Sequence, residues 1–324
     1  MTTSHSPEAL AAFGADVQLG LGKAQKALPA HYFYDDLGSQ LFEAICQLPW
    51  YPVTRAEKRL LERYAAAMVA PLGPIADLVE LGSGSGEKLA TIAAAIPATQ
   101  SPHGKLPVHL IDISEKALQL SRSNLGRLPQ LEVHGHRATY EAGLQGLSEG
   151  RASGGARLVL FLGSNIGNFD LTSAEHLLGE VRRALRPGDG LILGADLVRS
   201  EADLVLAYDD PLGVTAAFNK NLLVRMNREL GANFELDAWK HRALFSAKES
   251  RVEMHLVSRR PQHVRIPGAG VEASFAEGET IWTESSYKYT EASVAALGER
   301  VGLRRRDQWI EPEGRFSTTL FVVG

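Results

Sequence analysis

The sequence predicts an α/β protein, in which a mostly parallel β-sheet is joined by helical crossovers and a second, α+β domain accompanies the sheet. Apolar segments and helical patterns alternate from residue 75 onward. The apolar segments are continuous rather than alternating with polar residues, which is typical of strands buried on both faces of a parallel sheet. The first segment ends in three closely spaced glycines, and such a turn brings backbone close to a ligand.

The elements of the sheet follow one another in a regular order. The sequence predicts, along its middle, strand 78–81, helix 88–96, strand 107–114, helix 115–125, a weaker strand at 131–138, and strong strands at 156–163 and 190–197. The helix before the last strand follows helical spacing at Ala174, Leu177, Leu178, Val181 and Leu185. Thr172 and Glu175 predict a capping box at its start, and RPGDG at 186–190 ends it.

Two regions lie outside this alternation. Residues 1–58 form a helical preface, and residues 198–285 contain long helical and strand-like segments. A helix and two strands then complete the sheet, at 292–303, 305–312 and 316–324. We therefore predict a sheet domain and a second, substrate-binding or lid domain, which comprise residues 59–197 with 286–324 and residues 1–58 with 198–285, respectively.

The composition is that of a soluble globular protein. Of 324 residues, 44% are apolar and 22% charged, and the net charge of −4 gives no reason to expect nucleic acid or an anionic membrane as partner. The run Arg304–Arg306 is expected on a solvated strand edge, and the single Cys46 as a small buried side chain. No signal peptide or membrane span is visible, so we expect a cytoplasmic protein. We also expect it to be a monomer.

The glycine-rich turn in DLVELGSGSGEK, residues 77–88, indicates the ligand. A dinucleotide site has the pattern G-x-G-x-x-G. Here the third glycine, Gly86, follows Gly82 and Gly84 one residue early, and Glu87 stands where the dinucleotide glycine would be. The turn therefore fits a ligand without a diphosphate whose amino-acid tail lies along it, such as S-adenosylmethionine.

Asp112 supports this choice of ligand. It lies at the end of the second strand, where a carboxylate can accept hydrogen bonds from both ribose hydroxyls. Its distance from Gly84 exceeds the ~20 residues of the dinucleotide case, and the loop 98–104 accounts for the excess. A glycine-rich turn without a ligand, or an NAD enzyme, remains the alternative at this stage.

Together with LLGEVRRALRPGDGLIL at 177–193, these features resemble class I methyltransferases. That resemblance implies a Rossmann-like sheet of seven strands, mostly parallel. More specific segments resemble, nearly end to end, the L-histidine Nα-methyltransferases of the ergothioneine pathway. These segments are YFYDDLGSQLFEAICQLPWYPVTRAE (32–57), ELGSGSGEK (80–88), FLGSNIGNF (161–169), AYDDPLGVTAAFN (207–219), VEMHLVS (252–258) and IWTESSYKY (281–289).

The resemblance implies trimethylation of the α-amine of histidine to hercynine, with three molecules of S-adenosylmethionine and no metal. The residues that it implies for the methyl donor are Tyr34, Phe42, Gly82, Gly84, Lys88, Asp112, Thr139 and Tyr140. For the substrate, it implies Tyr51, Asn168 and Tyr208 at the carboxylate and amine, and Met254, Glu284 and Ser286 at the imidazole. Tyr34 and Asn168 are the expected catalytic residues, with the amine proton passing to solvent or through a tyrosine-bound water.

These residue types suit the chemistry. Neutral Asn and Tyr can hydrogen-bond a zwitterionic amino acid without an ion pair. Glu284 can accept from one imidazole nitrogen while the Ser286 hydroxyl serves the other. A site built on such paired contacts rejects amino acids that lack them, because its own polar groups would be left unpaired. Histidine is therefore expected over leucine or phenylalanine.

Structural explanations stand beside each assignment. Glu284 and Asn168 can be turn residues, Met254 core packing, and Tyr51 and Tyr208 buried aromatics. Other amines as substrates, and a non-catalytic binding protein of the same fold, are the alternative functions.

Two positions depart from the family pattern. Family members commonly have an aspartate where this chain has Thr139, so one carboxylate contact to the adenine amine is missing. The segment LPWYPVTR changes the usual tyrosine-tyrosine-proline order, and Tyr51 is assigned by counting without a gap. His134 and His136 share a strand face, but no cysteine or carboxylate partner is evident, and no metal site is expected.

Overall fold

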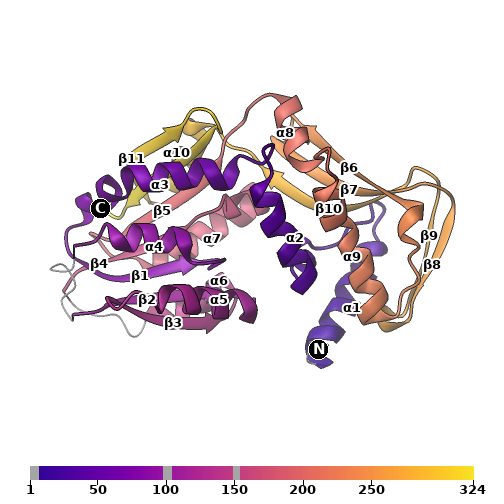
Figure 1. The fold of residues 1–324 in the computed structure, drawn as a ribbon, viewed down its shortest axis with the longest axis horizontal. Helices are drawn as coiled ribbons and strands as arrows, with labels where there is room; N and C mark the ends of the chain where they lie inside the picture. The colour runs from indigo at the N-terminus through magenta and orange to yellow at the C-terminus, as the bar shows by residue number, and fades with distance from the viewer. Residues whose placement is uncertain (1–6, 98–103, 149–153) are drawn as a thin grey trace. The chain divides into compact units, whose positions relative to one another are not determined.

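The computed structural model describes residues 7–97, 104–148 and 154–324. The chain separates into two compact units, each made of two segments (Figure 1). Unit 1 comprises Met1–Pro52 and Arg199–Tyr287, and unit 2 comprises Val53–Val198 and Lys288–Gly324. The loop 98–104, which was expected to lengthen the path to Asp112, lies outside the described residues except for Gly104.

Unit 2 contains a seven-stranded sheet in the order β11-β12-β5-β4-β1-β2-β3. Strands β1 to β5 pair in parallel, whereas β12 pairs antiparallel with both β5 and β11. The bounds are β1 Ile75–Leu81, β2 Leu106–Asp112, β3 Leu131–Arg137, β4 Ala156–Phe161, β5 Gly190–Asp196, β11 Arg304–Glu311 and β12 Phe316–Val322. The predicted fold class, a mostly parallel seven-stranded sheet, is confirmed.

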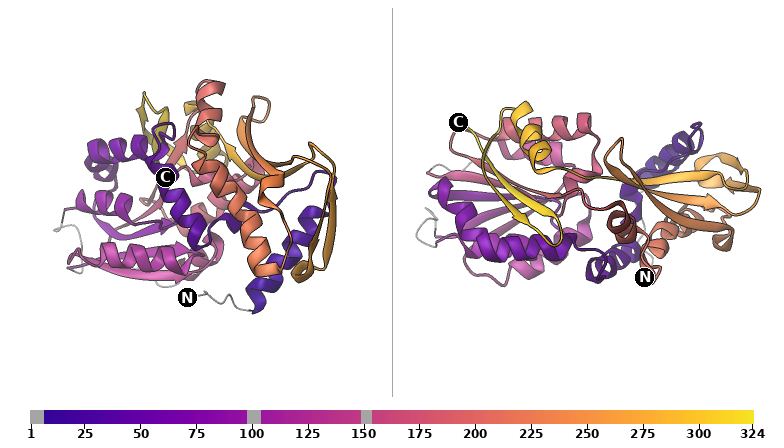
Figure 2. Two further views of the ribbon diagram at one scale, coloured as in Figure 1. Left: turned by 45° about the vertical axis from the view of Figure 1, so that its right-hand side comes forward. Right: turned by 90° about the horizontal axis from the view of Figure 1, so that it is seen from above.

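Helices cover both faces of this sheet (Figures 1 and 2). The helices are α3 Val53–Val69, η2 Ala70–Leu72, α4 Glu87–Ala94, α5 Glu115–Leu125, α6 Tyr140–Ser148, η4 Asn165–Asn168, α7 Leu171–Ala184 and α10 Glu291–Arg300. One core cluster joins Leu78 to α3, α4 and α5, and the other joins Val79 to α6, α7 and α10. Successive strand residues thus enter opposite cores, which explains the continuous apolar segments.

The expected capping box of α7 is wrong. The N-cap is Asp170, whose side chain accepts a hydrogen bond from the backbone of Ser173 at 2.8 Å. An aspartate caps a helix at least as well as a threonine, so the helix begins before Thr172. Glu175 instead forms an ion pair with Arg300, at 2.8 Å.

The basic run lies where it was expected. Arg304, Arg305 and Arg306 are exposed on β11, which is an edge strand of the sheet. Charged side chains on an edge strand disfavour pairing with another chain. Cys46 is buried, with 7% of its surface exposed, as a small core side chain.

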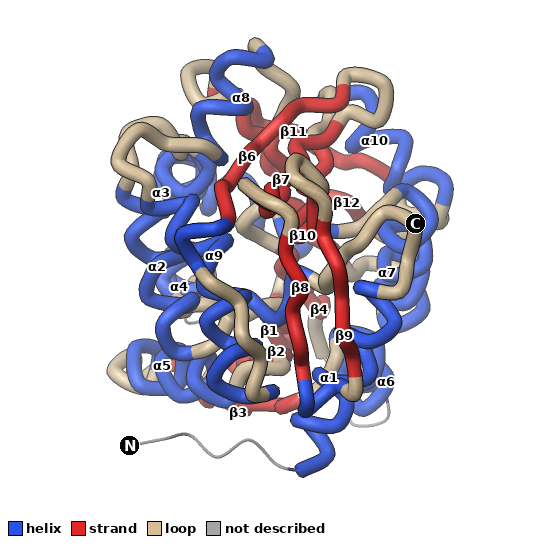
Figure 3. Tube along the Cα trace, turned by 90° about the vertical axis from the view of Figure 1, so that its right-hand side faces the viewer, coloured by secondary structure: helices blue, strands red, loops and turns tan. Residues whose placement is uncertain are grey.

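Unit 1 contains a three-stranded antiparallel sheet, β10-β7-β6, and a β8-β9 hairpin (Figure 3). The strands are β6 Trp239–Ser246, β7 Arg251–Ser258, β8 Gln262–Ile266, β9 Val271–Phe275 and β10 Thr280–Tyr287. The helices are α1 Pro7–Leu21, η1 Ala30–Phe33, α2 Asp36–Gln47, α8 Glu201–Tyr208, α9 Val214–Leu230, η5 Leu236–Ala238 and η6 Pro267–Ala269. Helix α9 contacts β6, β7 and β8.

The unit boundaries differ from the expected ones at three places, and the one expected after residue 197 differs by a single residue, because unit 2 runs to Val198. The boundary expected after residue 58 falls inside α3, a continuous helix whose buried face belongs to the core of unit 2. The boundary expected after residue 285 falls inside β10, which pairs with β7 up to Tyr287. Ser286 therefore belongs to unit 1. Within the ranges that the structure describes, no helix combines the length and hydropathy needed to cross a membrane.

Candidate active site

The glycine-rich turn connects β1 to α4, and all three glycines have positive φ: 81° at Gly82, 49° at Gly84 and 77° at Gly86. A Cβ on Gly82 would lie 2.9 Å from the hydroxyl oxygen of Tyr140, and one on Gly86 would lie 3.1 Å from the Leu125 side chain. A Cβ on Gly84 would meet nothing within 4 Å. Gly82 and Gly86 are thus required by packing, whereas Gly84 borders open space that suits a ligand.

Asp112 ends β2 and is held by two backbone amides. Its Oδ2 accepts from Ser83 N at 3.0 Å, and its Oδ1 accepts from Ser114 N at 2.8 Å. Burial raises the pKa of Asp112 above its usual value, although these hydrogen bonds oppose the shift. Oδ2 also accepts from Ser83 Oγ at 3.4 Å, and a ribose hydroxyl would compete with this longer contact. The neighbouring Ile113, 53% exposed, offers an apolar surface that sequence reasoning missed.

Thr139 and Tyr140 lie at the start of α6. The Thr139 hydroxyl accepts from Ala142 N at 3.3 Å, so it caps the start of the helix. The ring of Tyr140 packs edge-on against Phe161, with centroids 5.5 Å apart, and its hydroxyl borders Gly82. The structure thus brings Tyr140 to the glycine turn and gives Thr139 a structural contact.

Lys88, in the first turn of α4, is paired with a carboxylate that sequence reasoning missed. Its Nζ lies 2.5 Å from Oε2 of Glu57 in α3. The Glu57 side chain is fully buried and also accepts from Gly163 N at 2.8 Å. This pair ties α3 and α4 to the turn that follows β4.

Glu80, near the end of β1, is a second buried carboxylate that was missed. Burial raises its pKa to about 8, Lys88 opposes the shift, and Glu57 and Asp112 add to it. Its Oε2 has no hydrogen-bond partner among the residues that the structure describes. An acidic residue flanked by the apolar Val79 and Leu81 was the sequence signal that could have identified Glu80.

Asn168 is exposed at the end of η4, in the turn after β4. The turn begins at Ser164, which has a φ of 58° and whose hydroxyl accepts from Asp196 N at 2.9 Å. A serine with a left-handed backbone costs free energy and persists only where its surroundings hold it. Such strained residues cluster at functional sites. The structure therefore presents the Asn168 amide on a fixed turn.

In unit 1, an aromatic cluster contains four of the predicted site residues. Tyr34 packs against Phe42 and Phe218, with ring centroids 5.6 and 5.7 Å apart. Phe42 lies 6.4 Å from Tyr51, and Tyr51 lies 6.0 Å from Tyr208. Phe218, on α9, was missed because nothing in its sequence distinguishes a site aromatic from a core one. Tyr34 is 39% exposed, so this end of the cluster is accessible.

The remaining predicted substrate residues adjoin this cluster. The Tyr208 hydroxyl donates to Ser286 Oγ at 2.8 Å, and both side chains are buried. Glu284 on β10 stands opposite Met254 on β7 in the strand register. Met254 is only 1% exposed, which also fits core packing. Unit 1 thus groups five predicted substrate residues: Tyr51, Tyr208, Met254, Glu284 and Ser286.

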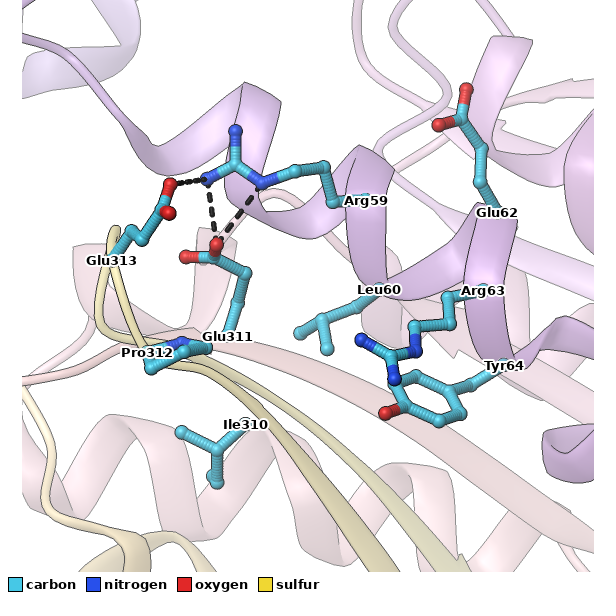
Figure 4. Close-up of a pocket in the computed structure, with 9 residues that line it drawn as sticks. All are labelled: Arg59, Leu60, Glu62, Arg63, Tyr64, Ile310, Glu311, Pro312 and Glu313. Carbon is cyan, nitrogen blue, oxygen red and sulfur yellow. Dashed lines mark hydrogen bonds and ion pairs between the residues drawn. The ribbon is translucent and has the colours of Figure 1, made fainter.

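A groove of about 500 Å³ lies in another part of unit 2 (Figure 4). Its lining residues are Arg59, Leu60, Glu62, Arg63, Tyr64, Ile310, Glu311, Pro312 and Glu313. Arg59 is paired with Glu311 at 2.8 Å and with Glu313 at 4.0 Å. None of the predicted site residues lines this groove.

The predicted histidine pair on β3 meets a third histidine on β2. His109 Nδ1 lies 3.1 Å from His136 Nε2, and the His109 ring stacks on His134 at 5.2 Å. Burial lowers the pKa of His109 to about 4, so that ring is neutral near pH 7. Over the described ranges, no group of three or more His, Cys, Asp and Glu residues could hold a metal ion.

Comparison with known proteins identifies the family. A family model described as histidine-specific methyltransferase, SAM-dependent, matches residues 13–323. Histidine N-alpha-methyltransferases of Mycolicibacterium smegmatis and Mycobacterium tuberculosis are 40% and 39% identical to the chain, over 95% and 94% of it and over 94% and 93% of their own lengths. The ergothioneine biosynthesis protein 1 of Neurospora crassa is 25% identical over 88% of this chain and 32% of that protein. The chain therefore belongs to the family of histidine-specific, S-adenosylmethionine-dependent methyltransferases.

Proposed function

We propose that the chain methylates the α-amino group of L-histidine three times to give hercynine, a step of ergothioneine biosynthesis. The observation that carries the proposal is the grouping in unit 1 of Glu284 opposite Met254 with the hydrogen-bonded pair Tyr208 and Ser286. Such a set of fixed polar groups suits a small zwitterionic substrate with a ring that has both a donor and an acceptor.

We assign binding of the methyl donor to unit 2. The open side of Gly84 would receive the amino-acid tail, and the Asp112 carboxylate would accept from the ribose hydroxyls. Ile113 and Tyr140 would flank the adenine. The Lys88 ammonium, paired with Glu57, would attract the donor's carboxylate. Tyr34 and Phe42 of unit 1 are assigned to the donor as well.

We assign the imidazole of the substrate to Glu284 and Ser286. A carboxylate accepts from one ring N–H, while the serine hydroxyl can donate to the other nitrogen of a neutral imidazole. The carboxylate and amine of the substrate are assigned to Tyr51, Asn168 and Tyr208.

The chemistry requires orientation more than acid–base power. The donor supplies an already activated methyl group on a sulfonium. Before each of the three transfers, the substrate nitrogen must lose a proton so that its lone pair can attack, and that proton passes to solvent. Tyr34, exposed at the edge of the aromatic cluster, is assigned to hold the water that receives it, and Asn168 to orient the amine.

A mass-resolved assay tests the proposal. Purified protein is incubated with L-histidine and S-adenosylmethionine, and the products are separated by mass. We expect mono- and dimethylhistidine to appear transiently and trimethylhistidine to accumulate. Accumulation of only the monomethyl product would contradict trimethylation, and turnover of another amino acid without any histidine product would contradict the substrate assignment.

We also infer that the chain acts as a monomer in the cytoplasm without a nucleic-acid or membrane partner. A net charge of −4 and a single buried cysteine support this inference. Light scattering coupled to size exclusion measures the mass in solution, and a dimeric mass would contradict a monomer. Cell fractionation tests the location.

A further inference from the structure

We propose that a β-bulge at residues 282–284 fixes Glu284 for the substrate imidazole, with Trp282 and Thr283 as the positioning residues that set selectivity for histidine. The inference rests on the proposed function, because its readout is the binding of histidine. Trp282 and Thr283 belong to unit 1, and neither of them has a role predicted from the sequence.

The bulge interrupts the pairing of β10 with β7. Trp282 stands opposite His255, whereas Glu284 stands opposite Met254, so Thr283 is the extra residue. A bulge bends its strand and re-aims the side chains that follow it. The position of Glu284 therefore depends on what holds the two residues before it.

Trp282 is held by a hydrogen bond and by a cation–π contact. Its indole N–H donates to the backbone carbonyl of Glu284 at 2.8 Å. The Arg251 guanidinium lies 4.5 Å from the centroid of the indole. Arg251 is itself fixed by hydrogen bonds to the Glu253 carboxylate and the Tyr287 hydroxyl, both at 2.8 Å. The indole is thus fixed in the orientation that keeps its hydrogen bond to Glu284.

The other side of the bulge is held through Thr283, which is only 1% exposed. Its Oγ1 lies 2.8 Å from Asn219 Oδ1 and 3.0 Å from the Met254 carbonyl oxygen. Asn219 Nδ2 lies 2.8 Å from His241 Nδ1, and His241 Nε2 lies 2.7 Å from the Tyr208 carbonyl oxygen. The network therefore runs from the bulge to the backbone of Tyr208, itself assigned to the substrate.

The hydrogen-bond directions from Tyr208 through His241 to Asn219 are determined, whereas the single Thr283 hydroxyl proton is shared between Asn219 Oδ1 and the Met254 carbonyl oxygen. The Tyr208 carbonyl only accepts, so His241 Nε2 carries the proton and Nδ1 is an acceptor. Asn219 must then donate to His241, which leaves its Oδ1 to accept from the Thr283 hydroxyl. Burial lowers the pKa of His241, which favours this neutral ring. A network with one consistent set of directions holds its members rigidly.

The test uses Trp282→Phe, which removes the indole N–H and keeps an aromatic ring. We expect the KM for histidine to rise roughly tenfold and the KM for S-adenosylmethionine to stay within about twofold, as for one lost hydrogen bond. Trp309→Phe is the control, because Trp309 is also half-buried but lies in unit 2. Its KM for histidine should match that of the unmodified chain, and thermal unfolding shows whether each variant is folded.

A double-mutant cycle separates positioning from general loss of structure. If Trp282 acts through Glu284, then Trp282→Phe should add nothing to the KM increase of Glu284→Ala. The proposal would be overturned if the KM increases of the two single substitutions multiplied in the double variant. It would also be overturned if Trp282→Phe alone left the KM for histidine unchanged. If Trp282→Phe does not fold, Thr283→Val and Thr283→Ser decide: the first should raise the KM, and the second, which keeps the hydroxyl, should not. If the unmodified chain made no methylhistidine, the proposed function would be contradicted as well. If it turned over histidine normally and the variants had the same KM, only this inference would be contradicted.

Discussion

At the scale of single residues, Glu80 shows how burial and charge compete near the glycine turn. It is 3% exposed at the end of β1, and burial outweighs the attraction of Lys88. The pKa of its carboxyl group is raised from 4.5 to about 8. Near pH 7 the folded chain therefore holds a proton on Glu80 that the unfolded chain has released.

This shift fixes the sign of a pH effect on stability. Between pH 4.5 and about 8, the folded chain binds more protons at Glu80 than the unfolded chain, so the free energy of unfolding falls as pH rises through this window. Glu80→Gln removes that titration. We expect urea denaturation of the variant to give a flatter dependence on pH and greater stability than the unmodified chain at the alkaline end.

Glu87→Gln is the matched control for this measurement. Glu87 is exposed at the start of α4, next to the same turn, and its replacement should leave the pH dependence of stability unchanged. An equal slope for Glu80→Gln and the unmodified chain would show that Glu80 does not hold the proton.

At the scale of elements, the β1–α4 turn separates packing from ligand binding. Gly84 and Gly231 both have positive φ, 49° and 65°, and a Cβ on either would meet nothing within 4 Å. Alanine at either position should therefore cost a similar free energy, about 1 kcal/mol. Only Gly84→Ala should weaken donor binding, by at least about tenfold, because only its open side is assigned to the donor.

Calorimetric titration with S-adenosylmethionine distinguishes the two alanine variants. Thermal unfolding without donor should give similar midpoints for both. If Gly231→Ala lost donor affinity to the same degree, or Gly84→Ala bound normally, the open side of Gly84 would have no role in binding.

The elements of unit 2 could be predicted well from the sequence, and those of unit 1 could not. Strands β4 and β5 are buried on both faces, so their apolar residues are contiguous and predict a parallel sheet. In contrast, β7 alternates the polar residues Arg251 and Glu253 with buried ones, and nothing in that pattern shows its partner strands or the bulge in β10. The predicted capping box of α7 was wrong because Thr172 and Asp170 are both suitable N-caps. Only the structure shows that Asp170 is the N-cap.

The candidate site divides in the same way. Gly82, Gly84 and Asp112 could be predicted because a turn and a strand end are local features. Glu57 and Phe218 could not, since each lies on a helix whose sequence does not show what it will contact. Side chains whose partners are distant in sequence become visible only when the chain is folded.

At the scale of the whole molecule, unit 2 must be completed by a segment that returns after nearly a hundred residues. The returning chain forms backbone hydrogen bonds at the end of β5, through Tyr289. Tyr289 N donates to the Asp196 carbonyl at 3.0 Å, and Val198 N donates to the Tyr289 carbonyl at 2.8 Å. Beside these bonds, Lys288 Nζ lies 2.8 Å from Asp196 Oδ2, and both side chains are buried.

This buried ion pair gives a prediction for the stability of unit 2. Lys288→Met would break the ion pair with the buried Asp196 carboxylate, and removing one partner of a buried pair costs about 3–5 kcal/mol. Replacing both partners, as in Lys288→Met with Asp196→Leu, removes the buried carboxylate as well, and we expect it to recover most of the lost stability. Urea denaturation of the three chains measures the difference. If single and double variants were equally destabilised, the loss would come from packing around Lys288 rather than from the buried charge.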